Sequence, residues 1–134
     1  MVWRWLLVVF YAVAGVTHLA NPPPFLRITP HWVPEPELVI ALTGIAELVG
    51  AMALAQPWSQ RLRQAGGIGL ALYAVCVFPA NINHMMMDLA RADRGAGLIY
   101  HAPRMVAQPL LVWLALWVGR VIDWPFSRSR TVSA

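Results

Sequence analysis

Glu47 is the residue of this chain whose type and position most clearly suggest chemistry. It lies near the centre of an apolar run that extends from Leu38 to Ala55. At roughly 1.5 Å per helical residue, that run is long enough to cross a bilayer. A carboxylate near the centre of such a helix costs about 2.5–3.5 kcal/mol to insert. We therefore expect Glu47 either to have a buried partner or to bind a ligand or a proton.

Other polar residues stand at or near the ends of further apolar segments. They are His18, Asn81, Asn83, His84, Arg104 and Gln108. Arg104 and Gln108 are spaced i, i+4 and therefore share one helical face. Ionisable groups inside a membrane usually face the interior and pair with one another, so His18 and Arg104 are the expected partners of Glu47.

Two interpretations of this polar set stay open. In the first, a buried ion pair and hydrogen-bonding amides fix the register of the helices. In the second, a polar pocket opens towards the outer face and binds a carbonyl or quinone head group, or relays a proton. The candidates for ligand binding or proton handling are His18, Glu47, Asn81, Asn83, Arg104 and Gln108.

A second cluster consists of His84 and the methionines that follow it, Met85, Met86 and Met87. Thioether and imidazole groups suit copper, and His31 and His101 are further imidazoles. On a helix, however, three consecutive methionines point in different directions, so copper is the weaker interpretation. A bis-histidine haem site lacks clear pairing. The sequence therefore assigns no cofactor, and a quinone is the candidate ligand.

Composition indicates an integral membrane protein. Of 134 residues, 59% are hydrophobic and only 12% are charged, where about a quarter is usual in soluble domains. We expect an all-α fold, a four-helix transmembrane bundle forming a single domain over residues 1–126. Its spans should lie at about 3–20, 37–55, 65–82 and 103–121, followed by a short basic tail, 127–134. The single cysteine, Cys76, should be a small core residue.

Arginine positions predict the orientation. Four spans place six arginines with the two termini and the 56–64 link, and the other four on the opposite side. This modest bias predicts cytoplasmic termini and a multi-pass protein of the inner membrane. The first segment has features of a signal peptide, but because the following chain is equally hydrophobic we expect it to stay as the first span. The outer segment 21–36 should cap the bundle, and 83–101 should be a polar loop.

Several ordered motifs resemble those of DoxX-like membrane proteins. They are Ala14-Gly15-Val16-Thr17-His18, Pro24-Phe25, Ile28-Thr29-Pro30, Val33-Pro34, Thr43–Gly50, Val77–Ile82 and Arg104-Met105-x-x-Gln108-Pro109-Leu110. The resemblance implies a four-helix protein of the cytoplasmic membrane. Some members of that family are small subunits of thiosulfate:quinone oxidoreductase, others belong to complexes handling oxidative stress, and a distant relative is a receptor-assembly chaperone.

From the residues and the resemblance together, the leading hypothesis is a redox-accessory subunit that binds a quinone-like or other small amphipathic molecule. One alternative is a non-catalytic structural or chaperone-like subunit of a membrane complex, and another is a copper-handling protein. The expected partners are the lipid bilayer and either a membrane protein or a second copy of the chain. The arginines form no stripe of the kind that binds nucleic acid, so no nucleic-acid partner is expected.

Overall fold

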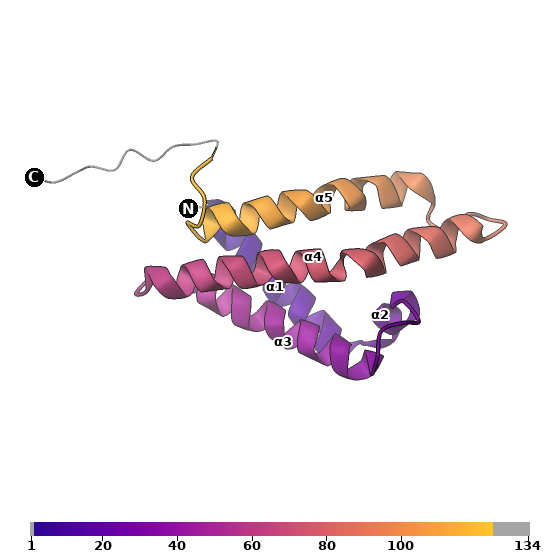
Figure 1. Ribbon diagram of the computed structural model, residues 1–134, viewed down its shortest axis with the longest axis horizontal. Helices are drawn as coiled ribbons and strands as arrows, with labels where there is room; N and C mark the ends of the chain where they lie inside the picture. The colour runs from indigo at the N-terminus through magenta and orange to yellow at the C-terminus, as the bar shows by residue number, and fades with distance from the viewer. Residues whose placement is uncertain (1, 125–134) are drawn as a thin grey trace, which may run out of the picture.

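The chain is helical throughout the part that the structure describes. The computed structural model describes residues 2–124, in which five helices and no strands are found (Figure 1). The helices are α1 (Val2–Ala20), α2 (Pro23–Ile28), α3 (Pro36–Ala55), α4 (Gln60–Ala90) and α5 (Gly97–Val118). The expected all-α fold is therefore confirmed. The predicted basic tail, 127–134, lies outside the described residues.

Three of these helices, α1, α3 and α4, are long and apolar enough to cross a membrane. The fourth long helix, α5, which contains most of the predicted span 103–121, does not belong to this group. The reason lies in its first half, which carries His101, Arg104 and Gln108 among its apolar residues. Hydropathy alone thus supports three membrane-crossing helices.

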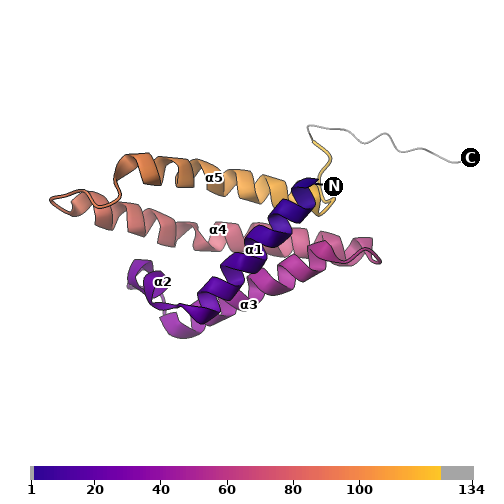
Figure 2. The ribbon, with the colours of Figure 1, turned by 180° about the vertical axis from the view of Figure 1, so that it is seen from behind.

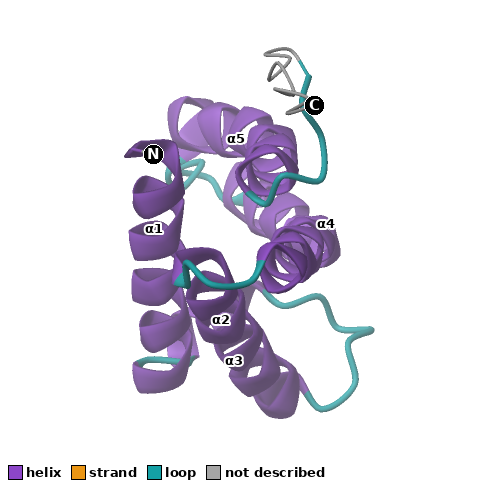
Figure 3. Ribbon diagram, turned by 90° about the vertical axis from the view of Figure 1, so that its left-hand side faces the viewer, coloured by secondary structure: helices purple, strands orange, loops and turns teal. Residues whose placement is uncertain are grey.

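Neighbouring helices pack in the order α1, α3, α4, α5, whereas α1 and α5 contact each other only slightly. Figures 1 and 2 show both described ends of the chain at one end of the molecule, together with the link between α3 and α4. Helix α2 and the turn between α4 and α5 lie at the opposite end, here called the α2 end. Figure 3 shows the helices nearly end-on, with α1 beside α3 and α4 beside α5.

Glycines allow the helices to approach closely. A Cβ atom at Gly15 of α1 would lie only 2.7 Å from the carbonyl oxygen of Gly44 in α3. One at Gly67 of α4 would lie 2.7 Å from the carbonyl oxygen of Ala115 in α5. Small residues at such crossings let backbones touch, as in other membrane helix pairs. Gly67 therefore allows the backbones of α4 and α5 to approach closely.

The expected polar loop at 83–101 is wrong. Helix α4 continues to Ala90 and α5 begins at Gly97, which leaves a short turn between them. Hydropathy marks the end of an apolar segment, but the helix itself can continue beyond that end when good helix formers follow, as they do in α4. The turn itself is marked by positive φ angles at Arg94, Gly95 and Gly97, of 57°, 51° and 68°.

Candidate functional site

A cavity of about 490 Å³ lies among the helices towards the α2 end. All five helices contribute to its lining, which is mostly apolar. This volume falls in the range of about 300–1,000 Å³ that is usual for small-molecule sites. Five of the six predicted site residues line it: His18, Glu47, Asn81, Arg104 and Gln108.

The segment 21–36 covers part of this cavity, as predicted from its apolar residues. Phe25 and Ile28 of α2 line the cavity, and so do Trp32 and Val33 in the turn that follows. The ring of Phe25 stacks on His18, with the two centroids 3.8 Å apart. Helix α2 therefore acts as a cap that holds the His18 ring in place.

Glu47 forms the first polar wall of the cavity. Its carboxylate is almost fully buried, and its Oε2 lies 2.7 Å from Nδ1 of His18. Nδ1 of His18 also lies 3.0 Å from the carbonyl oxygen of Ala14, one turn earlier in α1. The Tyr73 side chain of α4 lies beside the same carboxylate. His18 is thus the partner that offsets the insertion cost of Glu47, as predicted.

The second polar wall is a row of hydrogen bonds that joins α5 to α4. Arg104 donates to Oδ1 of Asn81, and Nδ2 of Asn81 donates to Oε1 of Gln108 at 3.1 Å. Gln108 in turn donates to the backbone carbonyl of Ala74 at 2.6 Å. Asn81 and Ala74 are spaced i, i+7 on α4, and Arg104 and Gln108 are spaced i, i+4 on α5, so each pair shares a face.

The predicted pairing of Arg104 with Glu47 is wrong. Among residues 2–124, no ion pair joins them, and Arg104 instead contacts Asn81, Nδ1 of His84 at 3.0 Å and the face of the Tyr100 ring. The physical reason is that Glu47 belongs to the α1–α3 pair and Arg104 to the α4–α5 pair. The cavity lies between these two pairs.

Two further predictions need correction. Asn83 does not line the cavity but donates to the carbonyl oxygen of Ile28 at 2.9 Å, which ties α4 to α2. Cys76 is exposed and lines the cavity, whereas a core position was expected. Whether Asn83 and Cys76 line the cavity depends on which face of α4 meets the other helices, and the sequence of α4 alone does not reveal this.

Two residues that line the cavity each have a buried polar atom with no hydrogen-bond donor or acceptor in suitable geometry among the described residues. One is the hydroxyl of Tyr11, a residue only 1% exposed, and the other is Oε2 of Glu47 despite its proximity to His18. Sequence reasoning missed Tyr11, since one tyrosine in an apolar helix is normally a packing residue. Its spacing to His18 of i, i+7 on α1 was the available signal.

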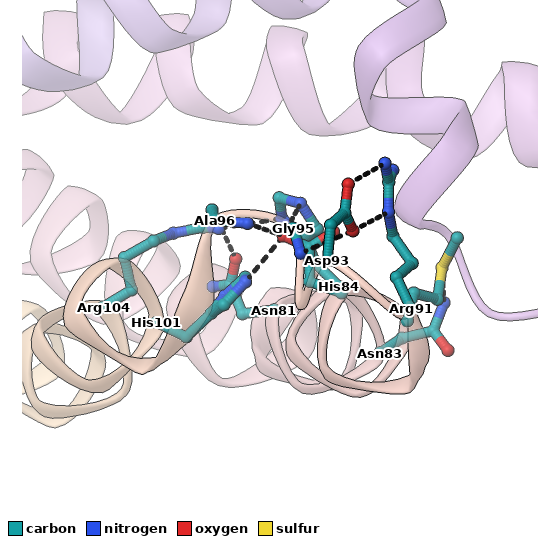
Figure 4. Close-up of polar contacts among 11 residues, drawn as sticks. Asn81, Asn83, His84, Arg91, Asp93, Gly95, Ala96, His101 and Arg104 are labelled. Atoms are coloured by element: carbon teal, nitrogen blue, oxygen red, sulfur yellow. Dashed lines mark hydrogen bonds and ion pairs between the residues drawn. The ribbon is translucent and has the colours of Figure 1, made fainter.

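Outside the cavity, three potential metal ligands meet near the turn between α4 and α5, and Figure 4 labels two of them, His84 and His101. Nε2 of His101 lies 3.0 Å from Oδ2 of Asp88, and Nε2 of His84 lies 3.6 Å from the same atom. Met86 and Met87 of the predicted copper cluster are exposed, and the copper interpretation stays a prediction. The structure therefore brings His84 together with Asp88 and His101.

A surface pair shapes the same turn. Arg91 donates two hydrogen bonds to Asp93, at 2.9 and 3.0 Å, and the backbone N–H of Gly95 donates a third (Figure 4). These bonds hold the pKa of Asp93 below its usual value, with the Arg91 bonds as the main cause. Both side chains are well exposed, so the pair organises the turn and does not face the cavity.

Comparison with known protein families gives a match over most of the chain. Residues 7–119 match the model of a family described as a domain of unknown function, DUF8561. No curated protein and no solved structure is significantly similar to the chain.

Proposed function

The chain belongs to the DUF8561 family, whose description leaves the function open, and we propose a function from the geometry of the cavity. The protein is a multi-pass membrane protein that binds a small amphipathic molecule with a quinone-like head group. The observation that carries this proposal is that Tyr11 and Glu47, two residues of the cavity lining, each have a buried oxygen atom without a hydrogen-bond partner among the described residues. A buried polar group without a partner costs about 1–3 kcal/mol, which a ligand carbonyl or hydroxyl would recover.

The membrane part of the proposal rests on the outer surface. Large apolar residues such as Val13, Leu42 and Leu72 are more than half exposed on the helices long enough to span a bilayer. Water would disfavour so extensive an apolar surface, whereas lipid would cover it. With α5 as a fourth crossing, both termini lie on one side, and the arginine bias makes that side cytoplasmic in an inner membrane.

Within the cavity, each polar wall has a proposed role. The side chains of Glu47 and His18 lie 2.7 Å apart and would together pass a proton to or from a quinone oxygen. Arg104 and Gln108 supply hydrogen-bond donors on the opposite wall, and the apolar lining holds the ring and the start of a tail. Electrons would come from a partner subunit, so the protein would act as a redox-accessory subunit, in keeping with the resemblance to DoxX-like proteins.

A second candidate function is a structural or chaperone-like subunit. The row from Arg104 to Ala74 favours it, because those hydrogen bonds join α4 and α5 without any ligand. Under this alternative, Glu47 and His18 likewise hold α3 against α1. The Tyr11 hydroxyl would bind the ligand under the first function, whereas it would have no role under the second.

Cys76 provides a direct test of occupancy, because it is the single cysteine and it lines the cavity. A fully substituted short-chain ubiquinone, which does not add to thiols, should slow alkylation of Cys76 by a membrane-permeant maleimide. At ten times its Kd the ligand should slow the reaction about tenfold, because only about one-tenth of the sites stay free. The rate is measured by mass spectrometry of protein in nanodiscs.

The matched control moves the thiol one helical turn away on α4. In a Cys76→Ala, Leu72→Cys double variant, the cysteine occupies an exposed position outside the cavity lining. The same quinone should leave its alkylation rate unchanged. Equal protection at both positions, or at neither, would contradict a ligand in this cavity.

Tyr11→Phe separates the two candidate functions. The substitution removes a hydroxyl that has no partner among the described residues, so the unliganded protein should keep its thermal stability or gain slightly. Quinone affinity should fall about fivefold to tenfold, the effect of one lost hydrogen bond of about 1 kcal/mol or more. Unchanged affinity measured by the Cys76 protection assay would favour the structural alternative.

A further inference from the structure

Three side chains near the turn between α4 and α5 direct their potential ligand atoms towards one point. The atoms are Nε2 of His84, Oδ2 of Asp88 and Nε2 of His101, and all three lie within 4.8 Å of one another. In a tetrahedral zinc site, metal–ligand distances of about 2.0–2.2 Å place neighbouring ligand atoms about 3.3 Å apart. The two distances to Asp88, 3.0 and 3.6 Å, lie on either side of that value.

The local fold holds Asp88 firmly in this position. His84 and Asp88 are spaced i, i+4 near the end of α4, while His101 enters from the start of α5. The backbone N–H of Ala96 donates to Oδ2 of Asp88 at 3.0 Å. A Cβ atom at Gly95 would lie 2.5 Å from the Asp88 carboxyl carbon, so only glycine leaves room for this carboxylate.

We propose that His84, Asp88 and His101 form a binding site for a divalent transition-metal ion, with zinc as the best-suited probe. Two imidazoles and one carboxylate form a donor set that zinc accepts, with a fourth position left for water or another ligand. His101 is fully buried, whereas the His84 side chain is 24% exposed, so an ion would enter from the His84 side. This site uses no methionine and does not depend on the quinone proposal.

Arg104 links the proposed metal site to the cavity, because it lines the cavity and also contacts His84. Its guanidinium lies 3.0 Å from Nδ1 of His84, and because arginine only donates, Nδ1 must be unprotonated there. In the neutral ring the proton then resides on Nε2, the atom that zinc needs. Metal binding would move this proton to Nδ1, where it would face the Arg104 guanidinium. Zinc and Arg104 therefore compete for His84, and metal binding would release Arg104 from His84.

Zinc titration of the full chain, freed of any affinity tag, tests the site. We expect the Asp88→Asn and His101→Ala variants to bind zinc at least about tenfold more weakly than the unchanged protein. His31→Ala is the control, because His31 is exposed and lies outside the cluster, and its affinity should match that of the unchanged protein. Asn at position 88 still accepts hydrogen bonds, so this variant tests the site even if His101→Ala does not fold.

The competition between zinc and Arg104 for His84 is tested by a substitution that should tighten zinc binding instead of weakening it. Arg104→Gln removes both the competing donor and a nearby positive charge, so it should tighten zinc binding about tenfold. Cobalt absorption provides a spectroscopic readout, with the band intensity of a four-coordinate site expected in the unchanged protein and lost in Asp88→Asn. Equal zinc affinity in the Asp88→Asn and unchanged proteins would overturn the site. Unchanged or weaker affinity in a folded Arg104→Gln protein would overturn the competition.

Discussion

Replacement of Glu47 by glutamine is expected to weaken quinone binding at least tenfold while the helices remain folded. Glutamine keeps the size of the side chain and a hydrogen-bonding group beside His18, but it cannot share or accept a proton as the carboxylate does. Hydrogen bonds to charged groups contribute about 1.5–3 kcal/mol, which corresponds to a factor of about ten or more in affinity. Ubiquinone titration with Cys76 protection as the signal measures this loss.

The matched control for this substitution is Glu37→Gln in the same helix. Glu37 is exposed in the first turn of α3 and undergoes the same chemical change, so its quinone affinity should match that of the unchanged protein. If Glu47→Gln instead bound quinone normally and only lowered the thermal stability in detergent, the carboxylate would only hold the helices together. The proposal that Glu47 binds a quinone in the cavity would then fail.

Replacement of Asn81 by leucine should cause the largest loss of stability. Asn81 is the central member of the row that joins α4 and α5, and leucine would leave both Arg104 and Oε1 of Gln108 without their present partner. Single hydrogen bonds between membrane helices contribute about 0.6 kcal/mol on average, but here a charged donor loses an acceptor as well. We expect a loss of about 2 kcal/mol, measured by unfolding in mixed micelles followed by circular dichroism.

Asn83→Leu offers the comparison, because the two asparagines lie two residues apart on α4. Among the described residues, Asn83 donates to the backbone of α2 and to the Met87 sulfur in its own helix but makes no hydrogen bond to α5. The loss of its side chain should therefore cost about 1 kcal/mol or less. The α4–α5 pairing should survive this change. An Asn81→Leu variant no less stable than Asn83→Leu would show that the row contributes little to the packing of α5.

Several features of the site were predictable because they follow from the free-energy cost of placing a polar group in an apolar helix, which does not depend on which helices pack together. A carboxylate such as Glu47 in an apolar helix needs a partner in any fold, and His18 is the partner found. The periodicity of α5 likewise places Arg104 and Gln108 on one face before any neighbour is known. The partner of Arg104 was predicted incorrectly, since Glu47 and Asn81 both offered acceptors and only the packing of α4 on α5 selects between them.

The sequence by itself determined the helical class, the apolar segments and the residues that cannot be left unpaired, because hydropathy, helical period and insertion cost are properties of single segments. Tertiary structure decided which faces meet. It assigned Cys76 and Tyr11 to the cavity lining, extended α4 into the predicted loop, and brought His84 together with Asp88 and His101. These outcomes depend on the crossing of helices far apart in the chain, which no single segment encodes.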